Sequence, residues 1–296
     1  MIAERVETLP LLPGVLLKVM QMDPESDAYF DEMVTLAAQE PNLAVRLVRF
    51  ANSAVSAPGR PVQTLYQAAM RLGTRECAHI ATMLAVARVF EPQTESQRTL
   101  WRHSILVAYL ARSISHRGGG QREEREQSYL AGLLHDIGRF VMFESAADDL
   151  QTVSEAACAS PDELLETEKR LLGYDHSQLG GRICERWELP PLLIEVVRRH
   201  HEHVPSPDAS SAVARELRIV RLADAIAMCV ETTPEIVDLE ETADVLRALA
   251  PAIRHTELGQ YESLMRHLAD HLPATIREAT RTYEQVMGLA PGVADH

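Results

Sequence analysis

Apolar residues recur every three or four positions along most of this chain, which is the spacing of one face of an α-helix. No stretch alternates apolar and polar residues in the way that is typical of a β-strand. The pattern therefore predicts an all-α fold. Its clearest stripe, within residues 99–116, consists of Leu100, His103, Val107, Leu110 and Ile114.

Prolines and glycines separate the periodic stretches and set the boundaries of the predicted helices. Pro24 and Pro41 fall between three short amphipathic stretches near the N-terminus, and three glycines at 118–120 follow a long one. The predicted helices are 14–22, 33–37, 43–51, 64–72, 75–90, 99–116, 122–134, 148–158, 161–172, 176–187, 192–202, 212–230, 235–249, 257–272 and 274–287.

A short polar stretch, Glu91–Gln97, interrupts the apolar periodicity and is the best candidate for a joint between subdomains. We therefore expect an N-terminal helical lobe over 1–95, a second helical lobe over 96–232, and C-terminal helices with a frayed tail over 233–296. At 296 residues the chain can bury one large core or two modest ones.

Composition resembles that of an ordinary globular protein, with 46% hydrophobic and 24% charged residues. The formal net charge of -14 opposes non-specific attraction to nucleic acid and to anionic membranes, so neither is an expected partner.

No signal peptide and no apolar run of bilayer length is evident, which makes the cytoplasm the expected location. The four widely spaced cysteines indicate neither a disulfide framework nor a zinc site.

The stretch Tyr129–Glu144 contains a carboxylate in an unusual place. Tyr129, Leu133 and Asp136 are spaced four and three apart, so the aspartate continues an apolar stripe and is predicted to point into a core. A buried unpaired charge is costly or shifts its pKa, so Asp136 needs a partner. The adjacent His135 makes a metal ion the expected partner.

Four further helices carry a histidine or an aspartate on an apolar stripe or at a helix end. Taken singly, each histidine is more simply explained as a core imidazole bonded to a carbonyl, and the pair 200–201 as a solvated helix end. Asp224 is harder to explain, because it lies in a stripe with Leu217, Val220 and Met228 and needs charge compensation. A shared metal explains all of these positions together.

Counting the candidate ligands predicts two metal ions. Adjacent helical residues point about 100° apart, so His135 and Asp136 can face neighbouring ions with the carboxylate bridging them. Mixed imidazole and carboxylate ligands favour two divalent transition metals, drawn from Fe, Mn, Zn and Co. The predicted ligand sets are His103, His135, Asp136 and Asp224 for one ion, and Asp136, His176, His200 and His201 for the other.

The order H…HD…D of these residues resembles the HD superfamily of metal-dependent phosphohydrolases, and the added histidines at 176, 200 and 201 are similar to the fuller ligand set of its HD-GYP branch. Three stretches within the first ninety residues, LPLLPGVLLKVM, QEPNLAVRLVRFANSA and TLYQAAMRLG, resemble the HDOD (HD-related output domain) family, a bacterial signalling branch of the superfamily. This resemblance covers about residues 9–230.

The resemblance implies an N-terminal helical lobe packed on an HD-type helical lobe, and a role in bacterial signal transduction. Many HDOD proteins lack the metal ligands and act as interaction or output modules, whereas this chain retains them. It also differs from the HD-GYP branch, because Arg139 replaces the lysine of HDIGK and no GYP segment follows HHEHVPSPD. Arg139 is the candidate phosphate-binding residue, since guanidinium pairs bidentately with phosphate.

Two functional hypotheses follow. In the first, the chain is a metal-dependent phosphohydrolase acting on a phosphodiester or nucleotide, with Asp136 and Arg139 as its catalytic residues. In the second, the HD lobe is structural or ligand-sensing, and the chain acts by binding a signalling protein partner or a nucleotide-type small ligand. The sequence favours metal binding more directly than catalysis, because ligands alone do not define a substrate pocket.

Overall fold

A computed structural model describes residues 28–39, 41–52, 61–145, 161–202 and 211–288, together with single positions at 7, 14, 18 and 22. Within these ranges every regular element is an α-helix or a short 3₁₀-helix, which confirms the predicted all-α fold. The predicted helices at 14–22 and 148–158 lie outside the described residues. The chain divides into two compact units, a larger one of 1–8 and 92–283 and a smaller one of 9–91 and 284–296.

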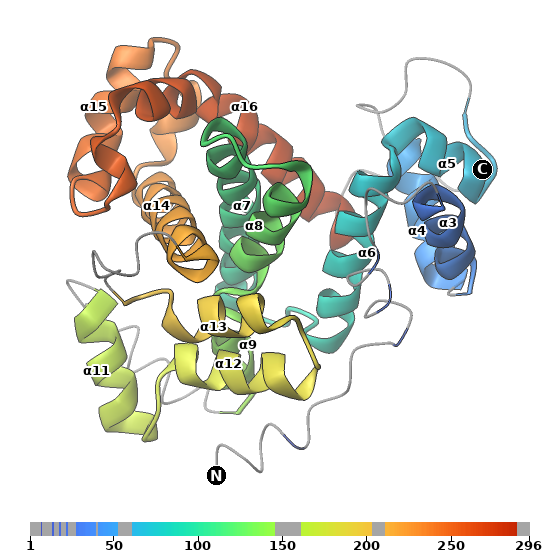
Figure 1. Cartoon of the computed structure of the whole chain (residues 1–296), viewed down its shortest axis with the longest axis horizontal. Helices are drawn as coiled ribbons and strands as arrows, with labels where there is room; N and C mark the ends of the chain where they lie inside the picture. The colour runs from blue at the N-terminus through green and yellow to red at the C-terminus, as the bar shows by residue number, and fades with distance from the viewer. Residues whose placement is uncertain are drawn as a thin grey trace. The chain divides into compact units, whose positions relative to one another are not determined.

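In the part of the smaller unit that the structure describes, four helices contact one another, coloured blue to cyan in Figure 1. Ala51, Val62 and Ala68 form a small buried cluster that joins two of these helices. The side chain of Asn52 accepts from the backbone N–H of Val62 and donates to its carbonyl, both at 2.8 Å, which fixes the entry to the next helix. The four helices are α3 (Tyr29–Ala38), α4 (Pro41–Ala51), α5 (Leu65–Leu72) and α6 (Thr74–Val89).

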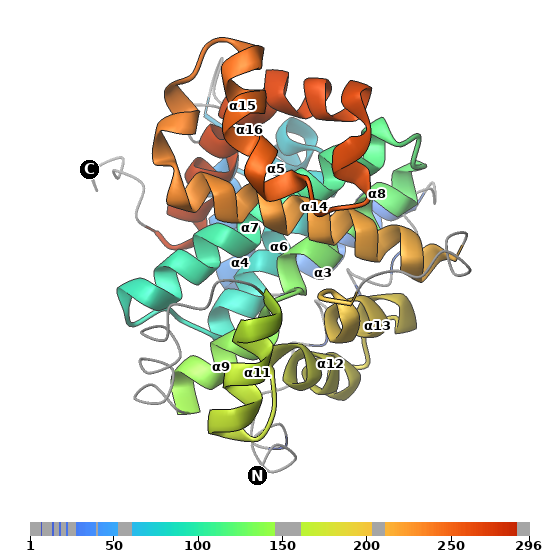
Figure 2. The ribbon, with the colours of Figure 1, turned by 90° about the vertical axis from the view of Figure 1, so that its left-hand side faces the viewer.

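Three helices, α7 (Glu95–Arg117), α8 (Arg122–Leu134) and α14 (Ala212–Thr232), pack against one another in the centre of the larger unit (Figure 2). A capping box at Thr94 and Gln97 begins α7. The stripe predicted for α7 faces the core, and all five of its members are buried: Leu100, His103, Val107, Leu110 and Ile114.

Among the described residues of the larger unit, four shorter helices lie between α8 and α14 in the sequence: α9 (Ile137–Ser145), α11 (Pro161–Leu172), α12 (His176–Arg186) and α13 (Pro191–Arg199). Both α9 and α13 lie against α12 (Figure 1). Two glycines of this region allow the helices to pack closely. A Cβ on Gly138 would lie 2.0 Å from the carbonyl oxygen of His176, and one on Gly180 would lie 2.8 Å from Val197 Cγ1.

The C-terminal part of the chain departs from the prediction. The predicted helix 235–249 begins instead as a separate 3₁₀-helix, and the two helices predicted on either side of Pro273 form one continuous helix. Ala269, Leu272 and Ala279 are buried on both sides of the proline, and this packing offsets the hydrogen bond that proline removes. These elements are η2 (Pro234–Asp238), α15 (Thr242–Ile253), η3 (Leu258–Gln260) and α16 (Glu262–Val286).

One position of the stripe predicted for α14 is also wrong. Leu217 and Val220 are buried, but Met228 is 48% exposed. Met228 follows Val220 by eight residues, which is two full helical turns plus about 80°. The side chain of Met228 therefore points away from the buried side on which Val220 lies. None of the described helices has the length and apolar character required to cross a bilayer.

Candidate metal centre

The larger unit gathers all seven residues predicted as metal ligands at one place. They come from α7, from the turn between α8 and α9, from the start of α12, from the end of α13 and from α14. Asp136 takes part in two groups, each of which brings three or more ligand atoms within 4.8 Å of one another. Whether the residues ligate metal stays a prediction, but the geometry permits it.

The first group consists of Asp136, His176, His200 and His201. Oδ1 of Asp136 lies 3.3 Å from Nε2 of His176 and 3.7 Å from Nε2 of His200. The Nε2 atoms of His176 and His201 are 2.9 Å apart. Three imidazole nitrogens and one carboxylate oxygen therefore face a common point.

The second group consists of His103, His135 and Asp136, with Asp224 beside it. Oδ1 of Asp224 lies 3.2 Å from Nε2 of His103 and 4.0 Å from Nε2 of His135. Oδ2 of Asp136 lies 3.8 Å from Nε2 of His135. Since Oδ1 of Asp136 faces the first group, its two oxygens point to different sides, as a bridging carboxylate requires.

Hydrogen bonds to Nδ1 orient four of the five histidines. An acceptor at Nδ1 holds the proton there and leaves the lone pair of Nε2 directed at the centre, which is the tautomer that a metal ion needs. The acceptors, at 2.7–2.8 Å, are the carbonyl oxygens of Gly132 for His135 and Val197 for His200, and the carboxylates of Glu168 for His176 and Glu231 for His103.

Two features of the centre fit a bound cation. Nε2 of His135 is buried and has no hydrogen-bond partner, although buried polar atoms normally have one. The close Nε2 atoms of His176 and His201 compete for a single proton, whereas a cation would accept both lone pairs. Imidazole and carboxylate together suit Zn, Fe, Mn or Co.

The electrostatics of the centre also favour a cation. Burial and the neighbouring His201 and His135 hold the pKa of His200 well below its usual range, and burial with His176 lowers the pKa of His201 to about 4. Both are therefore neutral, which is the ligand form. Burial opposes the protonation of His103, but Asp224 and Glu231 outweigh it and raise the pKa of His103 to about 10. That shift reports surplus negative charge at this side of the centre.

Arg139 lies at the edge of the centre. Its Nη1 donates to Oδ2 of Asp136 at 3.1 Å, and its side chain is 32% exposed. Burial opposes the charge of Arg139, but Asp136 and Glu168 outweigh it and raise the pKa of the guanidinium further. Nε of Arg139 is buried without a hydrogen-bond partner. A permanent cation with an unused donor next to the candidate metal ligands is suited to binding an anion.

Two carboxylates of the centre, Glu168 and Glu231, were not anticipated from the sequence. Glu231 follows Asp224 by seven residues, so both lie on one side of α14, and this spacing could have paired them. Glu168 gave no such signal, because it lies in a charged stretch between Glu166 and Lys169. Its burial depends on how α11 packs, which local periodicity does not encode.

The chain is similar in sequence to several known proteins. An uncharacterized protein of Treponema pallidum (strain Nichols) is 27% identical over 210 residues, which are 70% of this chain and 40% of that protein. Ribonuclease Y of Campylobacter curvus (strain 525.92) is 28% identical over 110 residues, which are 37% of this chain and 16% of that enzyme. The chain thus spans less than half the length of these relatives.

Solved structures share the fold. A candidate signal transduction protein from Marinobacter aquaeolei VT8 has a TM-score of 0.72 at 21% identity, covering 95% of this chain and 60% of that one. A candidate phosphohydrolase from Shewanella amazonensis SB2B has a TM-score of 0.68 at 22% identity, covering 95% of this chain and 97% of that one.

The profile of the HDOD domain matches residues 9–203, well over half of the sequence. The chain therefore belongs to the HDOD family.

Proposed function

We propose that this HDOD protein binds two divalent transition metals and hydrolyses a phosphodiester or nucleotide as part of a bacterial signalling pathway. The observation that carries the proposal is the orientation of His103, His135, His176 and His200, whose Nδ1 atoms are all engaged so that their Nε2 atoms face two carboxylates. Buried core histidines without a ligand would not need to share this orientation.

In the proposed reaction, Asp136 and Arg139 would have different roles. Asp136, with one oxygen toward each ligand group, would hold both ions in register. Bound metals would supply Lewis acidity and lower the pKa of a bound water. Arg139 would hold the phosphate group through the exposed part of its side chain, while remaining anchored to Asp136.

The substrate class follows from the same charges and is supported by the sequence relatives. A cationic side chain beside clustered metal ligands suits a phosphate ester rather than a neutral substrate. The matched relatives named ribonuclease Y act, by their name, on RNA, whose backbone consists of phosphodiesters. The net charge of -14 argues against long nucleic acid and in favour of a small phosphodiester or nucleotide.

A paired assay tests the proposal. Metal-reconstituted protein would be incubated with bis(p-nitrophenyl) phosphate, with a set of linear and cyclic nucleotides, and with a short single-stranded RNA. We expect turnover that Asp136→Asn abolishes together with metal binding. Arg139→Ala should keep the metals and lose about 10- to 100-fold in kcat/KM. Wild-type protein that holds two ions per chain but hydrolyses nothing in this set would argue against the hydrolase.

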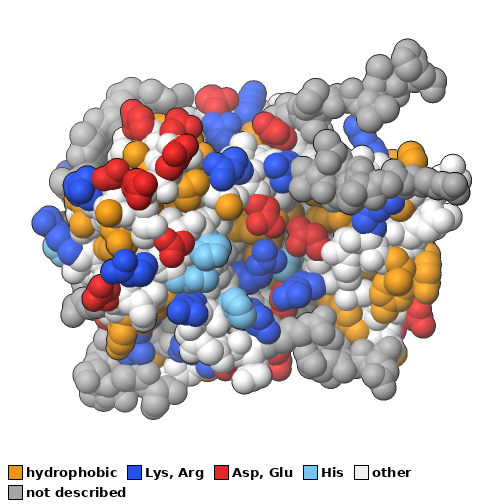
Figure 3. Space-filling model, turned by 90° about the horizontal axis from the view of Figure 1, so that it is seen from above, with side chains coloured by type: hydrophobic (Ala, Val, Ile, Leu, Met, Phe, Trp, Pro, Cys, Tyr) orange, Lys and Arg blue, Asp and Glu red, His pale blue; other side chains and the backbone are white. Residues whose placement is uncertain are grey.

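A second candidate function, binding of a signalling partner, is favoured by the α4–α5 face of the smaller unit. The stretch Pro41–Arg75 contains five arginines and no aspartate or glutamate, although the chain as a whole has a net charge of -14. Three exposed large apolar side chains lie on α4 and α5: Val45 at 59%, Tyr66 at 55% and Met70 at 63%. On the face of the molecule drawn in Figure 3, acidic and basic side chains are mixed over much of the surface.

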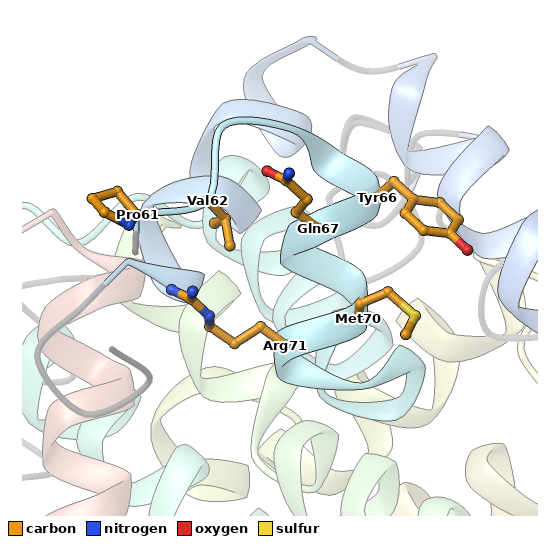
Figure 4. Close-up of a pocket in the computed structure, with 6 residues that line it drawn as sticks. All are labelled: Pro61, Val62, Tyr66, Gln67, Met70 and Arg71. Atoms are coloured by element: carbon orange, nitrogen blue, oxygen red, sulfur yellow. The ribbon is translucent and has the colours of Figure 1, made fainter. Parts of the chain in front are cut away.

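The α4–α5 face includes a shallow hollow of about 460 Å³ lined by Pro61, Val62, Tyr66, Gln67, Met70 and Arg71. Tyr66 and Met70 project from the same side of α5, one turn apart (Figure 4). Apolar anchors with arginines nearby suit an acidic amphipathic helix of a partner protein. One tyrosine among aliphatic side chains suits stacked nucleic-acid bases less well.

Peptide binding tests this second function. Fluorescence anisotropy would compare an amphipathic peptide with leucines on one face and glutamates on the other with the same peptide carrying lysines. We expect the acidic peptide to bind at least tenfold more tightly, and Arg49→Glu or Met70→Ser to weaken it. Arg182→Glu, an exposed change in the larger unit, is the charge-matched control. Equal binding of both peptides, or equal effects of Arg49→Glu and Arg182→Glu, would argue against this face.

A further inference from the structure

Each ligand group contains one histidine whose Nδ1 is bonded to a carboxylate and one whose Nδ1 is bonded to a backbone carbonyl. In the first group the carboxylate-bonded histidine is His176, and in the second it is His103. Starting from the proposed metal binding, we infer that Glu168 and Glu231 are positioning residues, each of which sets the metal affinity of its own group. The affinity for each ion could then be changed by substituting one carboxylate, without changing the affinity for the other ion.

Glu168 is placed by α11 and is almost completely buried, at 1% exposure. Its Oε2 accepts two hydrogen bonds from His176, one from Nδ1 at 2.7 Å and one from the backbone N–H at 2.9 Å. The backbone N–H can only donate, so the acceptor must remain at this position. The bond to Nδ1 therefore keeps its direction, and Nε2 of His176 keeps its lone pair toward Asp136.

Glu231 serves His103 in the same way but in a more open setting. Its Oε1 lies 2.8 Å from Nδ1 of His103, and its side chain is 37% exposed. Asp224 lies on the opposite edge of the same imidazole, 3.2 Å from Nε2. Water competes for an exposed carboxylate, so Glu231 should influence its histidine less than Glu168 does.

A carboxylate and a carbonyl differ as partners of a metal-binding imidazole. Both fix the ring and the tautomer, but the charged acceptor also makes the imidazole a stronger donor to the metal. The carbonyls of Gly132 and Val197 belong to the helical backbone and cannot be changed by substitution. The two carboxylates are therefore the points at which side-chain variation would tune the centre.

Titration with Co²⁺, followed by its visible absorption, would measure the two affinities in competition with a chelator. We expect Glu168→Gln to weaken one of the two binding steps about 10- to 100-fold, and Glu231→Gln to weaken the other by a smaller factor. The matched controls are Glu166→Gln, at an exposed position of α11, and Glu235→Gln, at an exposed position of η2 four residues after Glu231. Melting of the metal-free proteins would show whether each variant is folded, with Glu168→Asp as a second variant if Glu168→Gln is not.

A double-mutant cycle separates positioning from general structural support. Glu168→Gln should have no further effect on Co²⁺ affinity when His176 is already alanine, and should keep its full effect when His103 is alanine. Equal loss of both binding steps in Glu168→Gln, or an undiminished effect in the His176→Ala background, would overturn the inference. Wild-type protein that binds no Co²⁺ would instead contradict the proposed metal binding on which the inference rests.

Discussion

Asp136 is a buried carboxylate that several neighbours stabilise at once. Burial alone would raise its pKa, but His135, Arg139 and His176 outweigh burial and hold the pKa of Asp136 well below its usual range. The sequence predicted both the burial and the need for a partner from helical spacing alone. It could not predict that Arg139 would be one of those partners, because that contact depends on side-chain conformation.

Glu216 is also a buried carboxylate, but its pKa is shifted in the opposite direction from that of Asp136. It accepts from the hydroxyl of Ser128 at 2.7 Å and from Nε of Arg215 at 3.3 Å, and it is fully buried in α14. Burial outweighs both contacts and raises the pKa of Glu216 above its ordinary value. Its charged form is therefore destabilised in the folded protein.

We expect Glu216→Gln to make stability less dependent on pH. A carboxyl group whose folded pKa is raised favours the folded state below its unfolded pKa, and this contribution is lost as pH rises through the folded pKa. The unfolding free energy of Glu216→Gln relative to wild type should therefore increase between pH 4.5 and pH 8, as measured by urea denaturation. Glu235→Gln is the exposed control, and a difference that stays constant or falls with pH would contradict the assignment.

At the scale of helices, the site depends on the close approach of α9 and α12. Gly138 follows Asp136 by two residues, and its missing side chain allows the backbone of His176 to lie against it. Gly180 performs the same role on the facing helix. This contact brings Asp136, which directly precedes α9, close to His176 at the start of α12, so the glycines help to position candidate metal ligands as well as to form the fold.

Gly138→Ala should disrupt both stability and metal binding. The new Cβ would lie 2.0 Å from the carbonyl oxygen of His176, so the two helices must separate. We expect a loss of about 2–3 kcal/mol in unfolding free energy, together with weaker metal binding. Arg182→Ala, at an exposed position of α12, should change neither quantity. Thermal melting and Co²⁺ titration of both variants test this, and a Gly138→Ala protein with unchanged affinity would refute the role of the contact.

Helical periodicity predicted most of these elements, but not where packing overrides a local signal. The buried stripe of α7 was predicted correctly, because it follows from apolar spacing. The continuous helix through Pro273 was missed, since proline normally ends a helix and only tertiary burial offsets its effect. The buried Glu168 was missed for the same reason: its partner is brought near by the fold, not by spacing along α11.

At the scale of the whole molecule, the candidate metal ligands and the exposed apolar side chains of α4 and α5 belong to different units. The described ligand groups lie entirely in the larger unit, whereas the α4–α5 face lies in the smaller one. The stretch 41–75, which contains no aspartate or glutamate, also belongs to the smaller unit, whereas the chain as a whole has a net charge of -14. The metal chemistry that we propose thus belongs to the larger unit, and the binding of an acidic partner that we propose belongs to the smaller one.

Metal addition should stabilise the two units unequally. A ligand that binds only the folded state stabilises it by mass action, by about 2.7 kcal/mol at a hundredfold excess over Kd. We expect added Zn²⁺ to slow hydrogen exchange in α7, α12 and α14, with little change in α3–α5. Mass spectrometry of peptides from both units provides the measurement. Equal slowing in both units would show that binding is not confined to the larger one.

The metal content of the purified protein tests the central claim most directly. Elemental analysis after expression in metal-replete medium would count the ions per chain in wild type and in Asp136→Asn. Because the two oxygens of Asp136 face both ligand groups, we predict about two transition-metal ions per wild-type chain and a loss of both in the variant. Wild-type protein without bound metal, or an Asp136→Asn variant that retains both ions, would contradict the account.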